Sequence, residues 1–543
     1  MYRRHRRKHN NAHFSVRCIN ASCSQIRTGI VGTDGVKPYN ILILFFSLAY
    51  MAITLDITGI LQSAAFWVSN MGGSNGYKLY FYFYLMLTSL SVMLGNDPVI
   101  LSGTAFLVYY TKVQELDPIS WLMSEFAAAN TASMVLFVGN PTNVVVCEGF
   151  RINNVAFTAY TILPFLACNL ACLVVLAIQF RDEKYIPRRL AVSQDLDVRS
   201  VLLDPIGALV GSIILGTCLI TIIVVSFFHI DVWKISLPFA VTKFIYDFAW
   251  DHYRYTHGML KFQKRTNSND TVRPENAAEE IILDQLQRHR SPSYRQATLR
   301  DDDATLTQSR PNSFAVKQQR PTTTITPAPT ITDEPEPITI DTANLPTHSQ
   351  PPSPKTHSLL AHYHTLLSHT STHLHAHFPT FFTALPRLPF ALVPFAFSQF
   401  ILIEALAHQS WITRFAAWLV RATALKPYPT ILLVGTLGVL LCNVAGTNIG
   451  CTILLTKVVR AAGYNAAGER GAAVALAVAT NIGAVGFTFS ASLAGLLWCA
   501  ILKQKGIEVK QTRFAYWNLR PLVAMTAVGL AVVCAEMTVL YKY

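Results

Sequence analysis

A series of apolar stretches, most of them close to the length of a membrane span, restricts the fold of this chain more than any other feature. The stretches cover 41–61, 79–94, 122–146, 157–180, 205–228, 235–250, 388–407, 430–444, 471–500 and 522–540. A helix needs about 20 apolar residues to cross the hydrocarbon of a bilayer. Only 14% of the residues are charged, whereas soluble domains carry roughly 25%. The sequence therefore predicts an all-α polytopic membrane protein.

The charge balance fits this prediction and argues against other classes of protein. The net charge is +13. In a soluble chain that value would suggest nucleic-acid binding, but cytosolic loops of membrane proteins also collect Lys and Arg, so no nucleic-acid partner is expected. The ten cysteines show no CxxC or other metal-ligand spacing. We expect no metal and no cofactor, and the sequence contains no hydrolase nucleophile or Walker loop that would indicate an enzyme or an ATP-driven pump.

Composition divides the chain into four parts. Residues 1–37 open with a run of basic residues, and we interpret them as a cytosolic tail, with a mitochondrial presequence as the alternative. Residues 38–251 form a first membrane half and residues 385–543 a second. Residues 252–384 are rich in Ser, Thr, Pro and Gln, a composition that cannot bury enough apolar surface to offset the entropy of ordering. This predicts a disordered cytosolic insert, whose histidines between 357 and 377 we interpret as a solvated tract rather than a metal site.

One apolar stretch is interrupted by the sequence GNPTN at 139–143. Glycine and proline end regular helix and leave backbone groups without partners. Hydrocarbon tolerates such a break only where it is buried in protein or lines a wet cavity. Unpaired N–H groups at the start of a half-helix favour anions, free carbonyls at its other end favour cations, and Asn and Thr add neutral donors and acceptors. The break therefore predicts a binding site.

The two membrane halves follow the same plan. Each has a span, an amphipathic stretch and a second span that ends in a similar phrase, VMLGN up to Asn96 or VLLCN up to Asn443. Each then has a helix with an Asn near its break, Asn130 or Asn481, 34 and 38 residues further on. Duplicated halves with breaks at matching places are typical of secondary transporters, whose site lies near the bilayer midplane between the breaks. The alternative for any single Asn is that it only holds helices together.

Three motifs resemble those of a known family. GNDPVILSGT at 95–104, ANTAS at 129–133 leading to GNPTN, and ASLAGLLW at 491–498 are similar to segments of the arsenite/antimonite efflux permeases. That family belongs to the ion transporter superfamily, together with citrate–metal carriers, dicarboxylate/sodium symporters and some sodium/proton antiporters. The resemblance covers about 39–250 and 385–541 and leaves the insert outside.

The resemblance implies an inverted-repeat fold of about 10 spans with two re-entrant helical hairpins, of which 99–110 and 449–459 would be limbs. It also implies a homodimer that is held together by a scaffold, with a transport portion that moves as an elevator. By the same resemblance, the substrate site is lined from both halves by Asn96, Asn130, Asn140, Thr142, Asn143, Asn443, Thr447, Asn448, Asn481 and Ser492.

Two departures from the family pattern bear on these assignments. Ala491 stands where the family has Gly, and the spacing from Asn481 is one residue longer, so Ser490 and Ser492 are both candidates for that place. Relatives also carry extra apolar helix before the first span, where this chain has its basic tail, which allows an altered or truncated N-terminus.

Acidic residues at membrane depth are costly, so each of them invites a functional hypothesis. Asp97, at the first break, is the leading candidate for binding a coupling proton or sodium ion. Glu125, in the span that contains the break, is the second. The other acids that we considered are expected to cap helix ends or to form ion pairs: Asp56, Glu404 with Arg414, and Glu536 with Lys542.

The residue types at the two breaks favour a neutral substrate or a cation-coupled one, because no Arg or Lys lies within them. Neutral arsenite, As(OH)₃, suits amide and hydroxyl partners, so proton-coupled efflux of arsenite or antimonite is the leading hypothesis. The alternatives are a cation-coupled carrier of citrate, dicarboxylates or inorganic anions, and a non-transporting scaffold that acts through its insert. We expect a protein in the lipid bilayer of the plasma membrane, or alternatively of the vacuole or another organelle.

Overall fold

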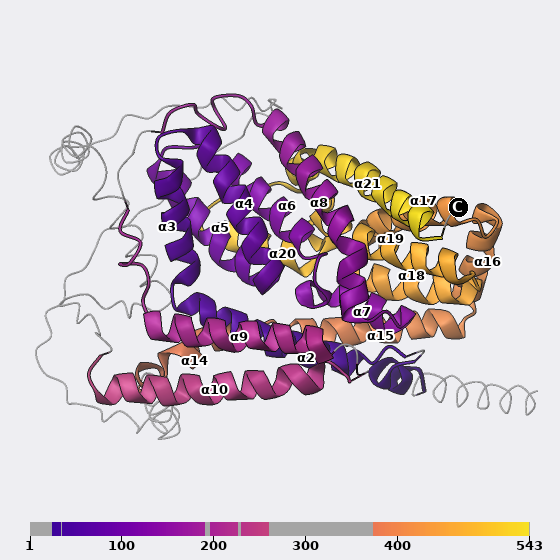
Figure 1. Ribbon diagram of the computed structural model, residues 1–543, viewed down its shortest axis with the longest axis horizontal. Coiled ribbons are helices and arrows are strands. Elements are labelled where there is room, and N and C mark those ends of the chain that lie inside the picture. Colours follow the sequence, from indigo (N-terminus) through magenta and orange to yellow (C-terminus); the bar gives the residue numbers. More distant parts are fainter. Residues whose placement is uncertain are drawn as a thin grey trace, which may run out of the picture. The chain divides into compact units, whose positions relative to one another are not determined.

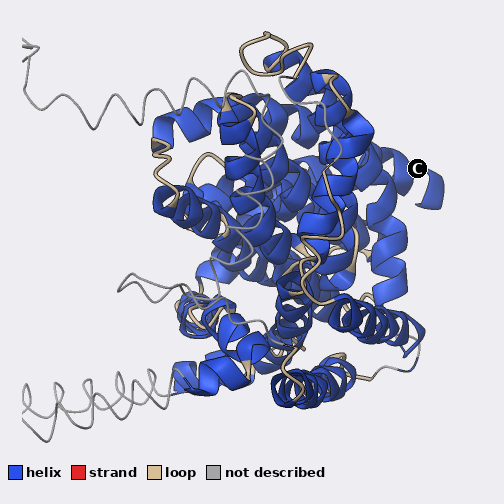
Figure 2. Cartoon of the chain, turned by 90° about the vertical axis from the view of Figure 1, so that its left-hand side faces the viewer, coloured by secondary structure: helices blue, strands red, loops and turns tan. Residues whose placement is uncertain are grey.

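The computed structural model describes residues 24–33, 35–190, 196–225, 228, 230–259 and 373–541. These residues form helices joined by loops, with isolated β-bridges in place of sheets (Figure 2). Most of the predicted basic tail and insert, 1–23 and 260–372, lies outside the described residues. Helix α14 (Pro379–Ala384) and the turn η4 (Leu385–Arg387) occupy the end of the predicted insert and the start of the predicted second half.

Two sets of helices follow one another in the same order. The first consists of α2 (Pro38–Ile57), α3 (Ile60–Gly72), α4 (Gly76–Leu94), α5 (Asn96–Val113), α6 (Pro118–Ala132), η1 (Phe137–Gly139), α7 (Pro141–Phe150) and α8 (Asn154–Gln179). The second consists of α15 (Leu392–His408), α16 (Trp411–Thr423), α17 (Pro427–Val444), α18 (Asn448–Ala462), α19 (Ala466–Val485), η5 (Phe489–Ala491), α20 (Leu493–Gln504) and α21 (Gln511–Tyr541). Helices α9 (Pro205–Val225) and α10 (Trp233–Thr256) stand between the two sets.

The two sets pack against each other through equivalent contacts (Figure 1). Helix α8 pairs with α21, and α6 pairs with α19. Helix α7 packs on α18 of the other set, and α20 packs on α5. Each half-helix that follows a break rests on a helix of the opposite set. The first break is therefore buried in protein, as hydrocarbon requires, and the second is covered in part, with residues 487–490 half-buried. The predicted all-α repeat fold is confirmed.

The predicted hairpins are present, and their second limbs are longer than the sequence suggested. The limb expected at 99–110 is α5, with 18 residues, and the limb expected at 449–459 is α18, with 15. Gly95 alone joins α4 to α5, and its φ of 84° lies in the region that favours glycine. Residues 445–447 join α17 to α18, with Gly446 at a φ of 77°. In both hairpins the two limbs pack along each other.

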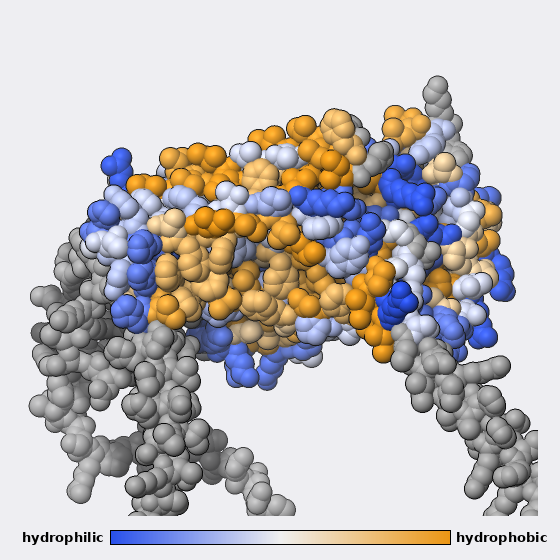
Figure 3. Space-filling view, turned by 90° about the horizontal axis from the view of Figure 1, so that it is seen from below, coloured by the Kyte–Doolittle hydropathy of each residue, from blue (hydrophilic) through white to orange (hydrophobic). Residues whose placement is uncertain are grey.

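Six helical stretches in the described part of the chain are long and apolar enough to cross a bilayer. They are α2, α8, α9, the continuous stretch Pro379–His408, α17 and α21. The predicted figure of about 10 spans also counted α4, α10 and the two broken pairs, α6–α7 and α19–α20. Exposed apolar side chains on α8 and α9, such as Leu170 and Leu209, and broad apolar areas on the face in Figure 3 suit contact with lipid tails.

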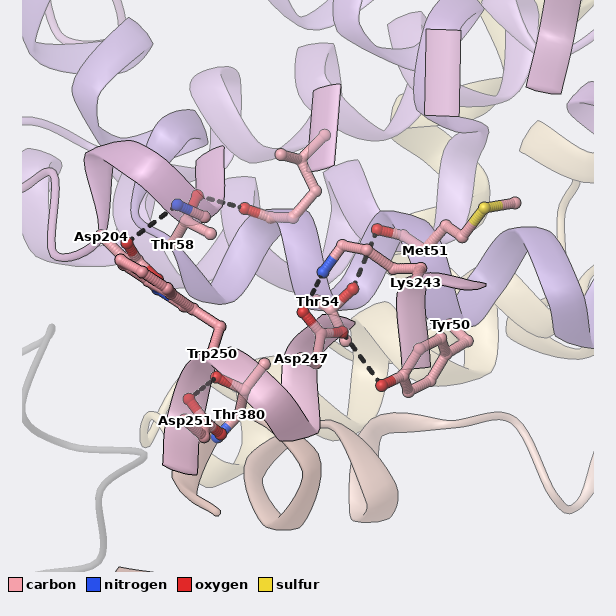
Figure 4. A network of polar contacts seen from close by, with 12 residues as sticks. Tyr50, Met51, Thr54, Thr58, Asp204, Lys243, Asp247, Trp250, Asp251 and Thr380 are labelled. Atoms are coloured by element: carbon pink, nitrogen blue, oxygen red, sulfur yellow. Dashed lines mark hydrogen bonds and ion pairs between the residues drawn. The ribbon is translucent and has the colours of Figure 1, made fainter. Parts of the chain in front are cut away.

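Helix α10 carries charges that the sequence prediction did not explain. Lys243, Asp247 and Asp251 are buried on one face, where α10 packs against α2, α9 and α14, while Val241 and Ile245 are exposed. The buried charges are partnered, as Figure 4 shows for Lys243 with Asp247 and for Asp247 with the hydroxyl of Tyr50. The polar face of α10 is therefore covered by protein.

Candidate substrate site

The first break is a tight turn between two half-helices. Asn140 caps α7, since its Oδ1 accepts a hydrogen bond from the Thr142 N–H at 3.1 Å. Pro141 follows as the first helical residue, where its missing N–H costs nothing. Gly139 is required because a Cβ at this position would lie 2.4 Å from the carbonyl oxygen of Ser133. The motif GNPTN therefore builds the turn itself.

Asn143 satisfies the carbonyl groups that the break leaves free. Its Nδ2 donates to the carbonyl oxygens of Ser133 and Leu136, both at 2.8 Å. Its Oδ1 accepts a hydrogen bond at 2.8 Å from Nδ2 of Asn481, which lies on α19 of the second repeat. The sequence analysis predicted free carbonyls at this position; in the structure an amide side chain from the break itself satisfies them.

A continuous polar network links the two repeats across the break. Asn96, at the start of α5, donates from Nδ2 to Oδ1 of Asn130 at 3.2 Å. The Ser133 hydroxyl lies between repeats, with its Oγ 2.9 Å from Oδ1 of Asn481 and 2.8 Å from the Asn130 carbonyl oxygen. Asn481 continues the network to Asn143. All five side chains are at most 5% exposed, so the network is sealed inside the protein.

Ser133 is a member of this network that the sequence analysis did not assign to the site. Its hydroxyl joins Asn130 to a residue 348 positions further along the chain. Its only signal in the sequence is its place in the ANTAS motif, three residues after Asn130. We therefore add it to the candidate site.

The second break uses different residues for the same purposes. Ser492 caps α20 by accepting from the Gly495 N–H at 3.0 Å, and its Oγ lies 3.1 Å from the Ala484 carbonyl oxygen. Ser490 instead contacts the Thr488 hydroxyl. Of the two serines that the sequence left open, Ser492 therefore occupies the position of Asn140 in the first repeat. The spacing from Asn481 to Ser492 is accordingly one residue longer than the spacing from Asn130 to Asn140.

Asn448, rather than Asn443, occupies the position in the second repeat that corresponds to Asn96 in the first. Asn96 is the first residue of α5, but Asn443 lies in the last turn of α17, and Asn448 is the first residue of α18. Asn448 is therefore the structural counterpart of Asn96, and matching Asn443 to Asn96 was wrong. Oδ1 of Asn443 accepts from the backbone N–H of Phe487 at 2.6 Å, which ties the second hairpin to the second break.

The remaining candidates lie around the hairpin tip and the first break. Thr447 caps α18 by accepting from the Ile449 N–H at 3.2 Å, and it contacts Oδ1 of Asn448. Thr142 is fully buried, and its Oγ1 has no hydrogen-bond partner among the described residues. A buried hydroxyl without a partner is costly, so a ligand at the break would find a ready donor there.

The two candidate coupling acids have different surroundings. Asp97 lies in the first turn of α5, where a negative charge is favoured by the helix dipole. It forms no hydrogen bond or ion pair with any described residue. Glu125 on α6 is fully buried, and its carboxylate accepts from the Thr104 hydroxyl, whose Oγ1 lies 3.1 and 3.0 Å from the two oxygens.

The other acidic residues were expected to cap helices or to form ion pairs, and their surroundings in the structure differ from one to the next. Glu404 pairs with Lys457 at 2.8 Å rather than with Arg414, which lies over the ring of Trp411. Asp56 pairs with Arg387 at 3.4 Å. Glu536 has one oxygen without a hydrogen-bond partner among the described residues, and its predicted partner, residue 542, lies outside them.

Sequence comparisons relate this chain to known transport proteins. The citrate transporter family matches residues 19–253, which contain the first hairpin and the first break. The arsenical pump membrane protein of Escherichia coli is 23% identical over 38% of this chain and 48% of its own length. Its counterpart from Yersinia enterocolitica is 25% identical over the same shares.

These relatives confirm the resemblance to the arsenite/antimonite permeases over the matched segment. The chain spans about half the length of the curated relatives that it matches. Among solved structures, the YdaH transporter of Alcanivorax borkumensis is similar with a TM-score of 0.43 and 11% identity, over 97% of this chain and 89% of that one. The residues that match the citrate transporter family include Asn96, Asn130 and Asn143, whereas Asn481 lies outside the match.

Proposed function

We propose that this protein is a secondary active transporter that exports arsenite, antimonite or a similar small oxyacid in exchange for protons. The observation that carries the proposal is the buried network from Asn96 to Asn481, which joins both repeats at the first break without a Lys or Arg. Amide and hydroxyl groups suit an uncharged oxyacid, because they bind it without an ion pair. The similarity to arsenical pump membrane proteins supports this choice of substrate.

Free hydrogen-bonding capacity separates substrate ligands from positioning residues. Both amide hydrogens and an oxygen lone pair of Asn143 are used, and Asn481 is bonded through Nδ2 and Oδ1. Oγ1 of Thr142 has no partner, and Nδ2 of Asn448 donates to no described residue. We assign Thr142 and Asn448 to the substrate, together with Asn96, whose Oδ1 accepts no hydrogen bond from the described residues. Asn143 and Asn481 hold the break in shape.

We assign proton coupling to Asp97 and Glu125. Asp97 adjoins Asn96, so its protonation changes the charge beside the substrate site. Glu125 is buried with a single hydroxyl donor. A charged carboxylate in such surroundings is costly, which favours a proton that is taken up and released during transport.

A second candidate function is cation-coupled transport of citrate or another dicarboxylate. Two observations favour it: the match of residues 19–253 to the citrate transporter family, and the four helices α5, α7, α18 and α20 that begin at the hairpins and breaks. Helix N-termini attract anions. Under this proposal Asp97 would bind the coupling cation.

Reconstituted vesicles distinguish the two functions. The purified full chain is placed in vesicles loaded with arsenite or with citrate, and efflux is followed with and without an imposed pH gradient or sodium gradient. We expect arsenite efflux that is accelerated when the outside is more acidic. Citrate flux driven by a sodium gradient, without arsenite flux, would replace the first proposal by the second. No flux of either would contradict both.

We also propose a homodimer in the plasma membrane, with the N-terminus and the insert on the cytosolic side. The mass of the detergent-solubilised protein tests the dimer, and fluorescent tagging tests the membrane. A monomer that transports at the full rate would contradict a functional need for the dimer.

Deleting the insert tests whether it carries the function instead of the membrane part. The deletion should be restricted to 261–371, because Asp251 on α10 accepts hydrogen bonds from the N–H and the hydroxyl of Thr380 on α14, both at 2.9 Å. Removing these anchors would damage the fold. We expect the shortened protein to keep its arsenite flux within about twofold of wild type, since a segment of this polar composition is not expected to form a core. Loss of flux with an unchanged unfolding temperature would favour a role that depends on the insert.

A further inference from the structure

A small cavity between α3, α4 and α5 has one polar end. It is lined mainly by apolar side chains, such as Phe83 and Leu107, and at one end by Gln62, Ser102 and Gly103. Its volume of about 20 Å³ is enough for one water molecule. The substrate site does not use this cavity.

Glu125 lies against Gly103, one of the residues that line the cavity. A Cβ on Gly103 would lie 2.5 Å from Oε1 of Glu125, so the absence of a side chain lets the cavity approach the carboxylate. The next residue, Thr104, donates to the same carboxylate. The polar end of the cavity therefore adjoins one of the two acids assigned to proton coupling.

A second buried acid lies on the other side of Ser102. Asp56, at the end of α2, is 3% exposed and faces both Ser102 and Gln62. Nε2 of Gln62 donates a hydrogen bond to Ser102 Oγ at 2.7 Å. Oδ1 of Asp56 and Oε1 of Gln62 are both buried without a hydrogen-bond partner among the described residues. A buried acceptor without a donor is costly, and a proton on Oδ1 of Asp56 would relieve that cost at the carboxyl.

The charged groups around this path are few. Arg387 of η4 approaches the other oxygen of Asp56, Oδ2, at 3.4 Å. The charges on α10 are engaged elsewhere: Lys243 pairs with Asp247 (Figure 4), and Asp251 pairs with Arg254. Asp204, before α9, pairs with the same arginine. Around Glu125 the hydrogen-bond donor is Thr104, a neutral group. Asp56 and Glu125 are thus the two acids that a proton on this path would use.

We propose that Asp56, Ser102 and one water molecule in the cavity form a proton path to Glu125. The Asp56 carboxyl gives its proton to Ser102 Oγ, the Ser102 hydroxyl proton passes to the water, and a water proton passes to Glu125. Ser102 and the water each end with the number of protons they began with, so one proton has moved from Asp56 to Glu125. This inference rests on the proposed proton-coupled function and adds the route by which the proton arrives.

The test compares two kinds of flux in vesicles that contain the full chain. Asp56→Asn keeps the size and polarity of the side chain but cannot release a proton. We expect arsenite flux driven by a pH gradient to fall about tenfold or more, the scale of losing one proton-transfer group. Arsenite-for-arsenite exchange without a gradient should stay within about twofold of wild type, because exchange needs no net proton movement. Asp56→Glu should restore part of the gradient-driven flux.

Each other outcome has a distinct meaning. If the variant keeps gradient-driven flux, the path is wrong. If it loses exchange as well and unfolds more readily, Asp56 serves only as the structural partner of Arg387 and the proposal is overturned. If wild type itself shows no response to the pH gradient, the proposed coupling fails before the path is tested.

A second variant tests the cavity independently of Asp56. Gly103→Ala places a methyl group against Glu125, and we expect the same selective loss of gradient-driven flux. Gly216→Ala on α9 is the matched control, since its Cβ would meet no atom within 4 Å. Equal pH-driven flux in Gly103→Ala and the control would contradict the path.

Discussion

Replacing Lys243 by alanine is expected to lower the free energy of unfolding by about 3–5 kcal/mol, the cost of leaving a buried charge without its partner. Lys243 and Asp247 form an ion pair in which the side chains are 1% and 5% exposed. Asp247 would keep only the hydroxyl of Tyr50, at 3.0 Å, as a donor. Gly211 on α9 leaves room for the lysine, because a Cβ there would lie 3.2 Å from Lys243 Cε.

Unfolding in mixed detergent micelles measures this effect. Lys503→Ala is the control, since Lys503 is an exposed lysine in the last turn of α20. Its loss should cost less than about 0.5 kcal/mol. Removing both charges with Lys243→Ala and Asp247→Ala together should recover much of the stability, because no unpaired charge remains. If Lys243→Ala were as stable as the control, the interpretation of α10 as a helix held by its buried charges would be wrong.

Replacing Asn143 by aspartate is expected to reduce arsenite efflux about tenfold or more while the protein still reaches the membrane. The new carboxylate has the same shape but no amide hydrogens, so the carbonyl groups of Ser133 and Leu136 lose their donor. Each buried acceptor without a partner costs about 1–3 kcal/mol. The break would then lose the shape that presents Thr142 to the substrate. Initial efflux rates, normalised to the amount of protein in the vesicles, measure the effect.

Asn153→Ala is the matched control for this substitution. Asn153 also accepts a hydrogen bond from a backbone N–H, that of Ala156 at 2.7 Å, but it caps α8 at an exposed position. Losing that cap should cost about 1 kcal/mol of stability and leave efflux close to wild type. Equal efflux in the Asn143 and Asn153 variants would show that the first break is not part of the transport site.

The sequence alone was sufficient to predict the repeat and the breaks, because both depend on local chemistry. Gly139 and Pro141 end helix wherever they occur, and the same order of spans appears twice. The apolar stretches likewise became helices. These features are written in short segments and do not require knowledge of distant contacts.

The correspondence of Asn443 with Asn96 failed for a physical reason. A phrase of apolar residues that ends in Asn can be matched without knowing where the hairpin turns. In the first hairpin the turn is Gly95 alone, whereas in the second it takes residues 445–447. The Asn at the start of the second limb is therefore Asn448. Turn length is set by the packing of the two limbs, and a single sequence does not reveal it.

Partners far apart in the chain could not be predicted either. The bond between Ser133 and Asn481 joins residues of opposite repeats, and Glu404 meets Lys457 on the second hairpin. The charges on α10 could not be assigned partners from the sequence, because Tyr50 on α2 and Thr380 on α14 are distant in the chain. Such pairs depend on the complete fold.

The central claim is that both repeats build one transport site, joined by the hydrogen bond between Asn143 and Asn481. The most direct test is a double-mutant cycle in arsenite exchange rates with Asn143→Ala, Asn481→Ala and both together. Residues that act as one unit lose little more together than apart. We predict that either substitution lowers the exchange rate about tenfold or more and that the double variant is no slower than the worse single one. A wild-type rate for either variant, or losses that multiply in the double variant, would contradict the shared site.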